Sequence, residues 1–186
     1  MMRMNKGRIK KIMITVTAAL VAAVFLSVPV MYLIRSSNLF LPDFAASVDK
    51  TVTDGEKGIT VIQKRRGVTV YRSGKKIWSL ERQVRSQEFL LADIDHDSED
   101  ELLILCWKRG RFGKHRPTWV KEDEKDYSQH IFIYEITEDK VIPKWMASDI
   151  GMDAASWEFD NGVLSITDTA GVVTKWVWIS WGLQKL

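Results

Sequence analysis

The residues best suited to chemistry in this chain are acidic side chains that recur at every second position of one short segment. Asp93, Asp95 and Asp97 alternate along the chain, and Glu99 and Glu101 continue the spacing. Carboxylates this close repel one another unless hydrogen bonds, solvent or a hard cation neutralise them. Calcium takes about six to eight oxygen ligands, often from alternating carboxylates and a backbone carbonyl. We therefore predict a calcium-type loop, to which Glu99 contributes its carbonyl and the others their side chains.

The spacing of this acidic loop (residues 93–101) excludes the best-known class of calcium loop. An EF-hand needs a bidentate Glu at position 12 and a helix on each side, and counting from Asp93 puts Ile104 at that position. The flanking segments 89–92 and 102–107 are short apolar runs typical of strands. The acidic loop is thus predicted to be the bend of a β-hairpin. An acidic turn that is solvated and binds no ion is the alternative.

The acidic loop resembles the short loop of FG-GAP or VCBS repeats, the repeats of integrin alpha chains, whose pattern is close to D-x-D-x-D-G-x-x-D. The resemblance implies two strands of a β-propeller blade around the loop, and adhesion or protein contact as the function. Two positions depart from the pattern. Ser98 replaces Gly where the turn favours a positive φ, and Glu101 replaces Asp with a longer ligand.

Beyond residue 58 the chain has the pattern of short strands separated by turn residues. The expected strands are 59–63, 67–72, 76–80, 89–92, 101–107, 129–136, 140–147, 155–159, 162–167 and 172–181. Asp160-Asn161-Gly162 is a strong signal for a tight hairpin between two of them. No convincing amphipathic helix accompanies the strands, so the predicted fold class is all-β.

A weak internal repeat groups these strands into larger units. Trp78 and Trp145 are 67 residues apart, as are Asp93 and Asp160, and each Trp follows a strand that contains a Tyr, Tyr71 or Tyr134. One unit would be a propeller-like blade of four antiparallel strands, and its first copy would lack the opening strand. Residues 59–186 have room for two to three blades. A closed propeller typically has 4 to 8, so we predict that the ring is not closed.

A long apolar stretch precedes the β region. Residues 12–34 are 23 positions without a charged side chain, enough for a helix to cross a hydrocarbon core of about 30 Å. Residues 1–11 are basic, and only Arg35 follows the stretch closely. The positive-inside rule then places the N-terminus in the cytoplasm. Removal of the stretch as a signal peptide, with a cleavage point near Ala45-Ala46-Ser47, is the alternative.

These patterns predict a single-pass protein of the plasma membrane with its C-terminal domain outside the cell. Its parts would be a cytoplasmic basic tail (1–11), a transmembrane helix in contact with the lipid bilayer (12–34), a linker or stalk (35–58) and an extracytoplasmic β domain (59–186). Six of the 27 basic residues lie up to Arg35, where there is no acidic residue, so the remainder has 21 basic and 24 acidic residues. A net charge of −3 in this part gives no electrostatic footprint for nucleic acid.

A second charged segment follows the last apolar run around the acidic loop. Its candidate partner-binding residues are Arg109, Arg111, Lys114, Arg116 and Trp119. They would grip an anionic envelope polymer, a lipid head group or an acidic protein through charge-assisted hydrogen bonds. The alternative is a solvated loop that the acidic residues 122–124 compensate.

The remaining reactive residue types form no catalytic arrangement. The three His residues have neither metal-ligand spacing nor a triad partner, and the lone Cys106 lies in an apolar strand where packing is its expected role. We therefore predict a non-catalytic binding or assembly module for an unknown protein or anionic envelope polymer, and not an enzyme. The alternative is a cell-envelope, glycan-acting hydrolase that uses the loop carboxylates, which requires opposed groups roughly 5 to 10 Å apart.

Overall fold

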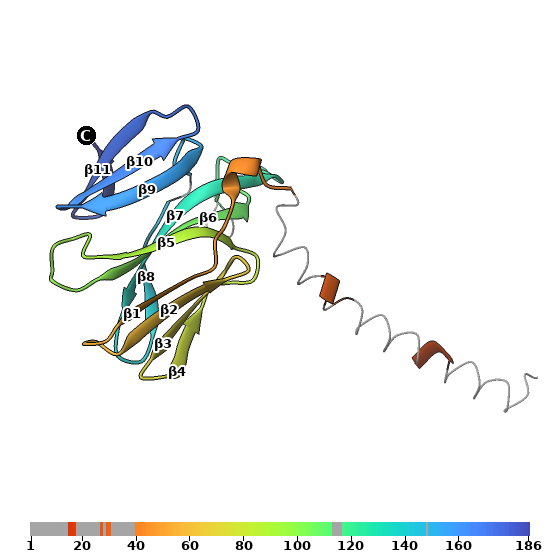
Figure 1. Cartoon of the computed structure of the whole chain (residues 1–186). Coiled ribbons are helices and arrows are strands. Elements are labelled where there is room, and N and C mark those ends of the chain that lie inside the picture. The colour runs from red at the N-terminus through yellow and green to blue at the C-terminus, as the bar shows by residue number, and fades with distance from the viewer. Residues whose placement is uncertain (1–14, 18–26, 28, 31–39, 113–116, 148) are drawn as a thin grey trace, which may run out of the picture. The chain divides into compact units, whose positions relative to one another are not determined.

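The computed structural model describes residues 15–17, 27, 29–30, 40–112, 117–147 and 149–186 (Figure 1). The chain divides into two compact units, Met1–Leu39 and Phe40–Leu186. The predicted basic tail and most of the predicted membrane helix over 12–34 lie outside the described residues. Within the described part of the chain, no helix is long and apolar enough to cross a membrane.

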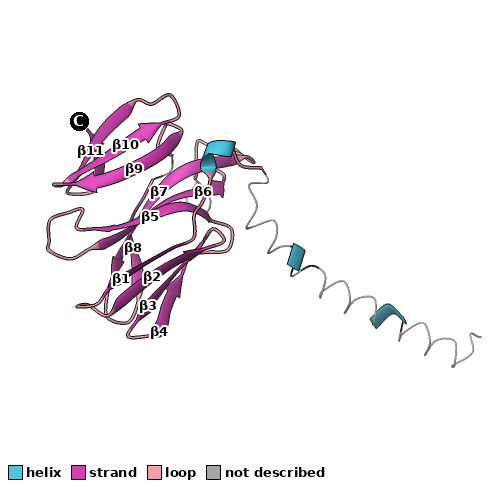
Figure 2. Ribbon diagram, in the orientation of Figure 1, coloured by secondary structure: helices cyan, strands magenta, loops and turns pink. Residues whose placement is uncertain are grey.

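The unit Phe40–Leu186 is all-β and contains three four-stranded antiparallel sheets (Figure 2). Sheet 1 contains β1 (Lys50–Asp54), β2 (Ile59–Lys64), β3 (Gly67–Arg72) and β4 (Lys75–Ser79). Sheet 2 contains β5 (Arg85–Ala92), β6 (Glu101–Arg109), β7 (Tyr127–Ile136) and β8 (Val141–Met146). Sheet 3 contains β9 (Ala154–Asp160), β10 (Val163–Asp168), β11 (Val173–Ile179) and β12 (Gly182–Lys185). Within each sheet, each strand pairs with its neighbours in sequence, and none of the sheets closes on itself.

The three sheets stack as layers, with sheet 2 in the middle (Figure 1). Because side chains alternate along a strand, Leu102 and Ile104 of β6 face the core shared with sheet 1. Leu103 and Leu105 face the core shared with sheet 3. Both faces of the middle sheet are therefore buried, which explains why β6 is a continuous apolar run instead of an alternating one.

A buried network of amide side chains links the three sheets. The Gln87 carbonyl oxygen on β5 accepts hydrogen bonds from Trp107 Nε1 at 2.8 Å and from Gln129 Nε2 at 2.9 Å. Gln129 in turn accepts from the backbone N–H of Ala154 on β9 at 2.7 Å. Gln63 on β2 donates to the backbone carbonyl of Gln87 at 2.9 Å. Partners on β2, β5, β7 and β9 thus satisfy polar groups that would be costly to bury alone.

The sequence repeat corresponds to equivalent positions in two sheets. Trp78 lies on β4 and Trp145 on β8, the fourth strands of sheets 1 and 2. The pairing register shifts immediately before Tyr71 in sheet 1 and immediately before Tyr134 in sheet 2. The two sheets therefore share their strand order, their Trp position and a local irregularity.

Two boundaries predicted from the sequence were wrong. The predicted linker over 35–58 contains a 3-10 turn, η1 (Asp43–Ala45), and the strand β1, which is the opening strand that sheet 1 was expected to lack. Val52 is the one strongly apolar residue of β1, so the strand has no clear apolar pattern. The strand expected over 172–181 is instead two strands, β11 and β12, joined by a turn at Ser180-Trp181.

Candidate functional site

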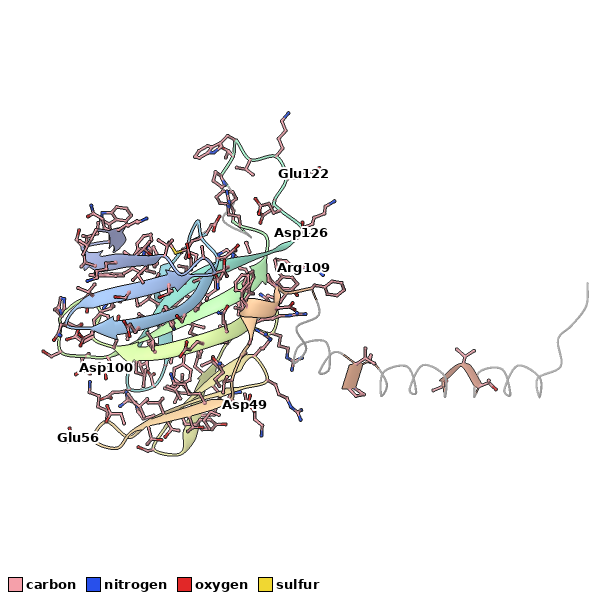
Figure 3. The ribbon with its side chains drawn as sticks, turned by 45° about the horizontal axis from the view of Figure 1, so that its top comes forward. Asp49, Glu56, Asp100, Arg109, Glu122 and Asp126 are labelled. Atoms are coloured by element: carbon pink, nitrogen blue, oxygen red, sulfur yellow. The ribbon has the colours of Figure 1, made fainter. Side chains whose placement is uncertain are left out.

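The acidic loop is the bend of the β5–β6 hairpin, as its flanking sequences predicted. The two strands end where Ala92 pairs with Glu101, and Figure 3 labels Asp100 on the loop between them. Ile94 is fully buried in the core between sheets 2 and 3. This side chain anchors the loop, because exposing it would return its apolar surface to water.

Three of the four predicted side-chain ligands converge. One carboxylate oxygen each of Asp93, Asp95 and Glu101 lies within 4.8 Å of the others. Asp97 belongs to the loop, but its carboxylate accepts the backbone N–H of Glu99 at 2.8 Å. The Glu99 carboxylate pairs with Lys57 Nζ at 2.8 Å.

The loop is closed by hydrogen bonds to its own backbone. The two oxygens of Asp93 accept the N–H groups of Asp97 and Ser98, both at 3.0 Å. Glu101 Oε2 accepts the N–H of Ile94 at 3.1 Å. Two of the converging carboxylates therefore organise the turn itself.

Backbone conformation and packing fix the tip of the loop. Ser98 has a φ of 74°, in the left-handed region that favours Gly. His96, also left-handed, lies against the β9–β10 turn, since a Cβ built on Gly162 would be 2.6 Å from His96 Cε1. The acidic loop thus packs on sheet 3, and this packing requires Gly at position 162.

A lysine from another strand neutralises part of the acidic cluster. Lys144 on β8 places Nζ 2.6 Å from Glu101 Oε1 and forms a second ion pair with Asp95 Oδ2. Lys144 and Asp95 are each 18% exposed and Glu101 is 1% exposed. The ammonium group also lies 5.9 Å from the centre of the Trp178 ring. A cation is therefore already present beside two of the three carboxylates, and it belongs to the protein.

Burial and pairing shift the pKa values of both partners upward for different reasons. Burial raises the pKa of Glu101, although its bonds to Lys144 and to the Ile94 N–H oppose that rise. Burial would lower the pKa of Lys144, but hydrogen bonds to Asp95 and Glu101 outweigh it and raise that pKa. Glu101 is the more buried of the two, so desolvation dominates for the acid and pairing for the base.

The donor set suits a hard cation, but Lys144 competes for it. All the converging groups are carboxylates, the ligand type that calcium prefers. Asp95 Oδ1 is buried without a hydrogen-bond partner, so it is available as a ligand. Three negative charges against one ammonium leave a net charge of −2 at the cluster. The residues fit a calcium ion provided that Lys144 shares or gives up its two carboxylates.

The structure describes three of the five predicted partner-binding residues. The five residues are Arg109, Arg111, Lys114, Arg116 and Trp119. The Arg109 guanidinium lies over the Tyr127 ring at 5.2 Å, and Arg111 pairs with Asp149. Lys114 and Arg116 lie outside the described residues, whereas Trp119 is 82% exposed. The two described arginines are thus engaged within the domain, and Trp119 faces solvent.

A buried histidine lies away from the acidic loop. His130 on β7 donates from Nδ1 to the Ala147 carbonyl at 2.9 Å, so its Nε2 accepts from the Ser128 hydroxyl, also at 2.9 Å. Burial lowers the pKa of His130. Cys106, its cross-strand neighbour, is fully buried as expected, and burial raises the pKa of the thiol.

The sequence reasoning missed Lys144. Lys144 is far from the acidic loop in sequence, and no local spacing connects the two. The only indication in the sequence was electrostatic, because carboxylates this close repel one another unless a positive charge lies nearby. No protein-family model, curated protein or solved structure matches the chain.

Proposed function

We propose that this protein is a membrane-anchored, extracytoplasmic binding or assembly module that does not catalyse a reaction. The observation that carries this proposal is the closed acidic loop, whose carboxylates bind its own backbone and Lys144. A glycan hydrolase needs two carboxylates on opposite sides of a space that admits a glycosidic bond. Here the Lys144 ammonium lies between Asp95 and Glu101, where that bond would have to be.

The arrangement of the sheets supports a propeller-like assembly of FG-GAP type as the scaffold. Each sheet is a four-stranded antiparallel meander, and the sheets stack face to face in chain order. The acidic loop follows the first strand of sheet 2, where the family resemblance expects it. If each sheet is one blade, no fourth sheet of the described residues covers the outer faces of sheets 1 and 3. A partner protein or an anionic envelope polymer is the proposed ligand of this open scaffold.

Calcium is the proposed ion of the acidic loop. Asp93, Asp95 and Glu101 would hold it, and the ion would stiffen the hairpin and take no part in a reaction. A ligand that binds only the folded state raises the melting temperature. For the full chain in detergent, we expect melting several degrees higher in calcium than in chelator. Equal melting temperatures would show that Lys144 alone neutralises the loop.

The membrane anchor is proposed from the sequence. Residues 12–34 have the length and apolar character of a single span, and the basic residues of 1–11 set its orientation. The β unit begins at Phe40. The β domain would then stand on the outer face of the plasma membrane.

Incubation with purified envelope glycans separates the module from the alternative hydrolase. The module is expected to leave the size distribution of the glycans unchanged while co-sedimenting with them or with a partner protein. A hydrolase would release fragments, and Glu101→Gln and Asp93→Asn would abolish that release. Fragment release that depends on these two carboxylates would overturn the non-catalytic proposal.

A further inference from the structure

The long loop between β6 and β7 leaves sheet 2 beside the point where the chain enters the β unit. A hydrogen bond from the Gly110 N–H to the Asp126 carbonyl, at 3.1 Å, closes the base of the loop. The Arg109 guanidinium lies 6.0 Å from the ring of Phe40, the first residue of the unit. In Figure 3, Arg109 lies next to η1, Asp126 lies above Arg109, and the segment with Glu122 extends away from the strands.

The entry segment, residues 40–47, is fixed to the same end of sheet 2. The Phe44 ring packs on Trp107 with 5.7 Å between ring centres. Leu41 and Ala45 form a small core with Trp107, and the buried Arg66 donates to the Ala45 carbonyl. The position of the entry segment relative to the loop is therefore set by packing within the unit.

Little chain separates this end of the unit from the apolar stretch 12–34. Residues 35–39 are the five positions between them, and five residues span at most about 18 Å. If residues 12–34 cross the bilayer, as the proposed function holds, Phe40 and the base of the loop must be close to the membrane surface. The length of this link therefore limits which part of the β unit can meet lipid.

The loop presents a tryptophan at a turn. The Val120 N–H donates to the Pro117 carbonyl at 3.0 Å, so Thr118 and Trp119 occupy the two central positions. Both side chains are exposed, and Trp119 is exposed to 82%. Tryptophan has a large apolar ring with one polar N–H and is enriched at membrane–water interfaces. Nothing in the described part of the chain covers this ring.

The charges near the turn partly cancel one another. Lys121 and Glu122 follow Trp119 closely, and both are exposed. The Asp123 carboxylate is turned inward and accepts the backbone N–H groups of Arg111 at 2.8 Å and Phe112 at 3.3 Å. Glu124 is 3.9 Å from the Arg111 guanidinium. Part of the acidic charge of the loop is thus taken up by the loop itself.

We propose that the turn 117–120 inserts the Trp119 ring into the lipid head-group layer of the membrane that anchors the chain. This inference rests on the proposed membrane anchor. The β unit then meets the membrane at two points, the chain entry and the Trp119 turn, and its orientation on the surface is fixed.

Spin labels on the full chain in liposomes of phosphatidylcholine and phosphatidylglycerol test the proposal. One label replaces Thr118 (Thr118→Cys) and the control label replaces Ser180 (Ser180→Cys), which is next to Trp181, 73% exposed in the β11–β12 turn. Cys106 is buried and does not compete for the reagent. We expect the label at 118 to be relaxed at least twofold more by oxygen than by a water-soluble nickel complex, and the label at 180 to show the reverse.

Two further measurements decide between the possible failures. Trp119→Ala, made together with the label at 118, should return that label to the aqueous behaviour of the one at 180. Flotation of the full chain with the liposomes tests the anchor separately. An aqueous label at 118 on a chain that floats overturns the inference and leaves the anchor intact, whereas a chain that does not float overturns both.

Discussion

At the acidic loop, a lysine side chain supplies the positive charge that the sequence pattern assigns to a metal ion. Lys144 reaches two of the three converging carboxylates, and one of these, Glu101, is 1% exposed. Removing one partner of a buried ion pair leaves an uncompensated charge and typically costs about 3 to 5 kcal/mol. The loop therefore depends on Lys144 wherever no other cation is bound.

Replacing Lys144 makes this dependence measurable. Lys144→Met keeps the aliphatic stem and is expected to lower the free energy of unfolding by about 3 kcal/mol in chelator. Calcium should restore more stability to this variant than to the unmodified protein, because the ion no longer competes with an ammonium group for Asp95 and Glu101. Thermal melts of the full chain in detergent, with and without calcium, measure both effects.

The matched control for this prediction is Lys175→Met, an exposed lysine on β11. Its melting temperature should respond to calcium as that of the unmodified protein does. A Lys144→Met variant that loses stability and regains none of it in calcium would rule out an ion at this cluster.

His130 makes the stability of the fold dependent on pH. Because burial lowers its pKa, the folded state takes up a proton less readily than the unfolded state, whose His has a pKa of about 6.5. The stability that neutral His130 contributes is thus fully present above about pH 6.5 and is lost as the pH falls below it. His130→Asn keeps a donor toward the Ala147 carbonyl and should flatten the loss between pH 7 and pH 5.

Glu101 has the opposite effect on the pH dependence of folding stability, at acidic pH. Its raised pKa makes the folded state bind a proton first, so this group favours folding as the pH falls. Urea unfolding at pH 7 and pH 5 measures the change in stability for His130→Asn and for the unmodified protein. The Glu101 contribution is the same in both, so the difference between the two proteins reports His130. An unchanged pH dependence in the variant would show that His130 is not the group responsible.

At the scale of strands, the close packing of sheet 3 on sheet 2 requires a glycine. A Cβ built on Gly182, at the start of β12, would lie 2.5 Å from Trp145 Nε1 of β8. Gly182→Ala must therefore displace the half-buried Trp145 ring, and we expect a loss of about 1 to 3 kcal/mol, the usual cost of overpacking. Chemical denaturation followed by tryptophan fluorescence measures it.

Gly55, in the turn between β1 and β2, is the control for that substitution. No atom lies within 4 Å of a Cβ built on Gly55, and its φ is not among the positive ones. Gly55→Ala should be neutral or stabilise by up to about 1 kcal/mol, because it restricts the unfolded chain. Equal losses in the two variants would contradict the proposed steric origin.

Strand positions were largely predictable because alternation and turn residues act locally. The predicted segments 59–63, 67–72 and 101–107 match β2, β3 and β6 closely, and Asn161-Gly162 forms the expected tight turn. Strand β1 was not predicted because it forms by pairing with β2, and its own sequence is mostly polar. The β11–β12 turn has no Asn or Asp, so residues 172–181 were predicted as one strand.

The composition of the site was less predictable than the fold. The positions of Asp93, Asp95 and Glu101 could be inferred from spacing because a hairpin brings alternate residues to one bend. Lys144 could not, because it depends on which face of β8 meets the loop, a tertiary property. Asp97 was predicted as a side-chain ligand, but its carboxylate instead accepts the N–H of Glu99, and the Glu99 carboxylate, which was not a predicted ligand, pairs with Lys57.

At the scale of the whole β unit, two separate cores join neighbouring layers. One lies between sheets 1 and 2 and the other between sheets 2 and 3. Gln129 reinforces the second, because it bonds to both the N–H and the carbonyl of Ala154, at 2.7 and 2.8 Å. Of these two cores, sheet 3 contributes only to the one that it shares with sheet 2.

Removing the amide of Gln129 should loosen sheet 3 selectively. Gln129→Leu removes the side-chain acceptor of the buried Ala154 N–H, at a cost of about 1 to 3 kcal/mol, whereas the Ala154 carbonyl keeps the hydrogen bond from Gln87 Nε2 at 3.2 Å. Hydrogen exchange should then speed up in β9 to β12 more than in β1 to β4. Gln184→Leu, an exposed change on β12, is the control and should leave both rates unchanged. Uniform acceleration in all three sheets would show that the unit opens as a whole.

The register shift that precedes Tyr71 in sheet 1 and Tyr134 in sheet 2 bears on the history of the chain. Irregularities of pairing are inherited within families because neighbouring side chains adapt to them. A tandem duplication of one four-stranded unit would give both sheets this irregularity and the Trp that follows it. In that case the acidic loop and Lys144 would distinguish the second copy from the first.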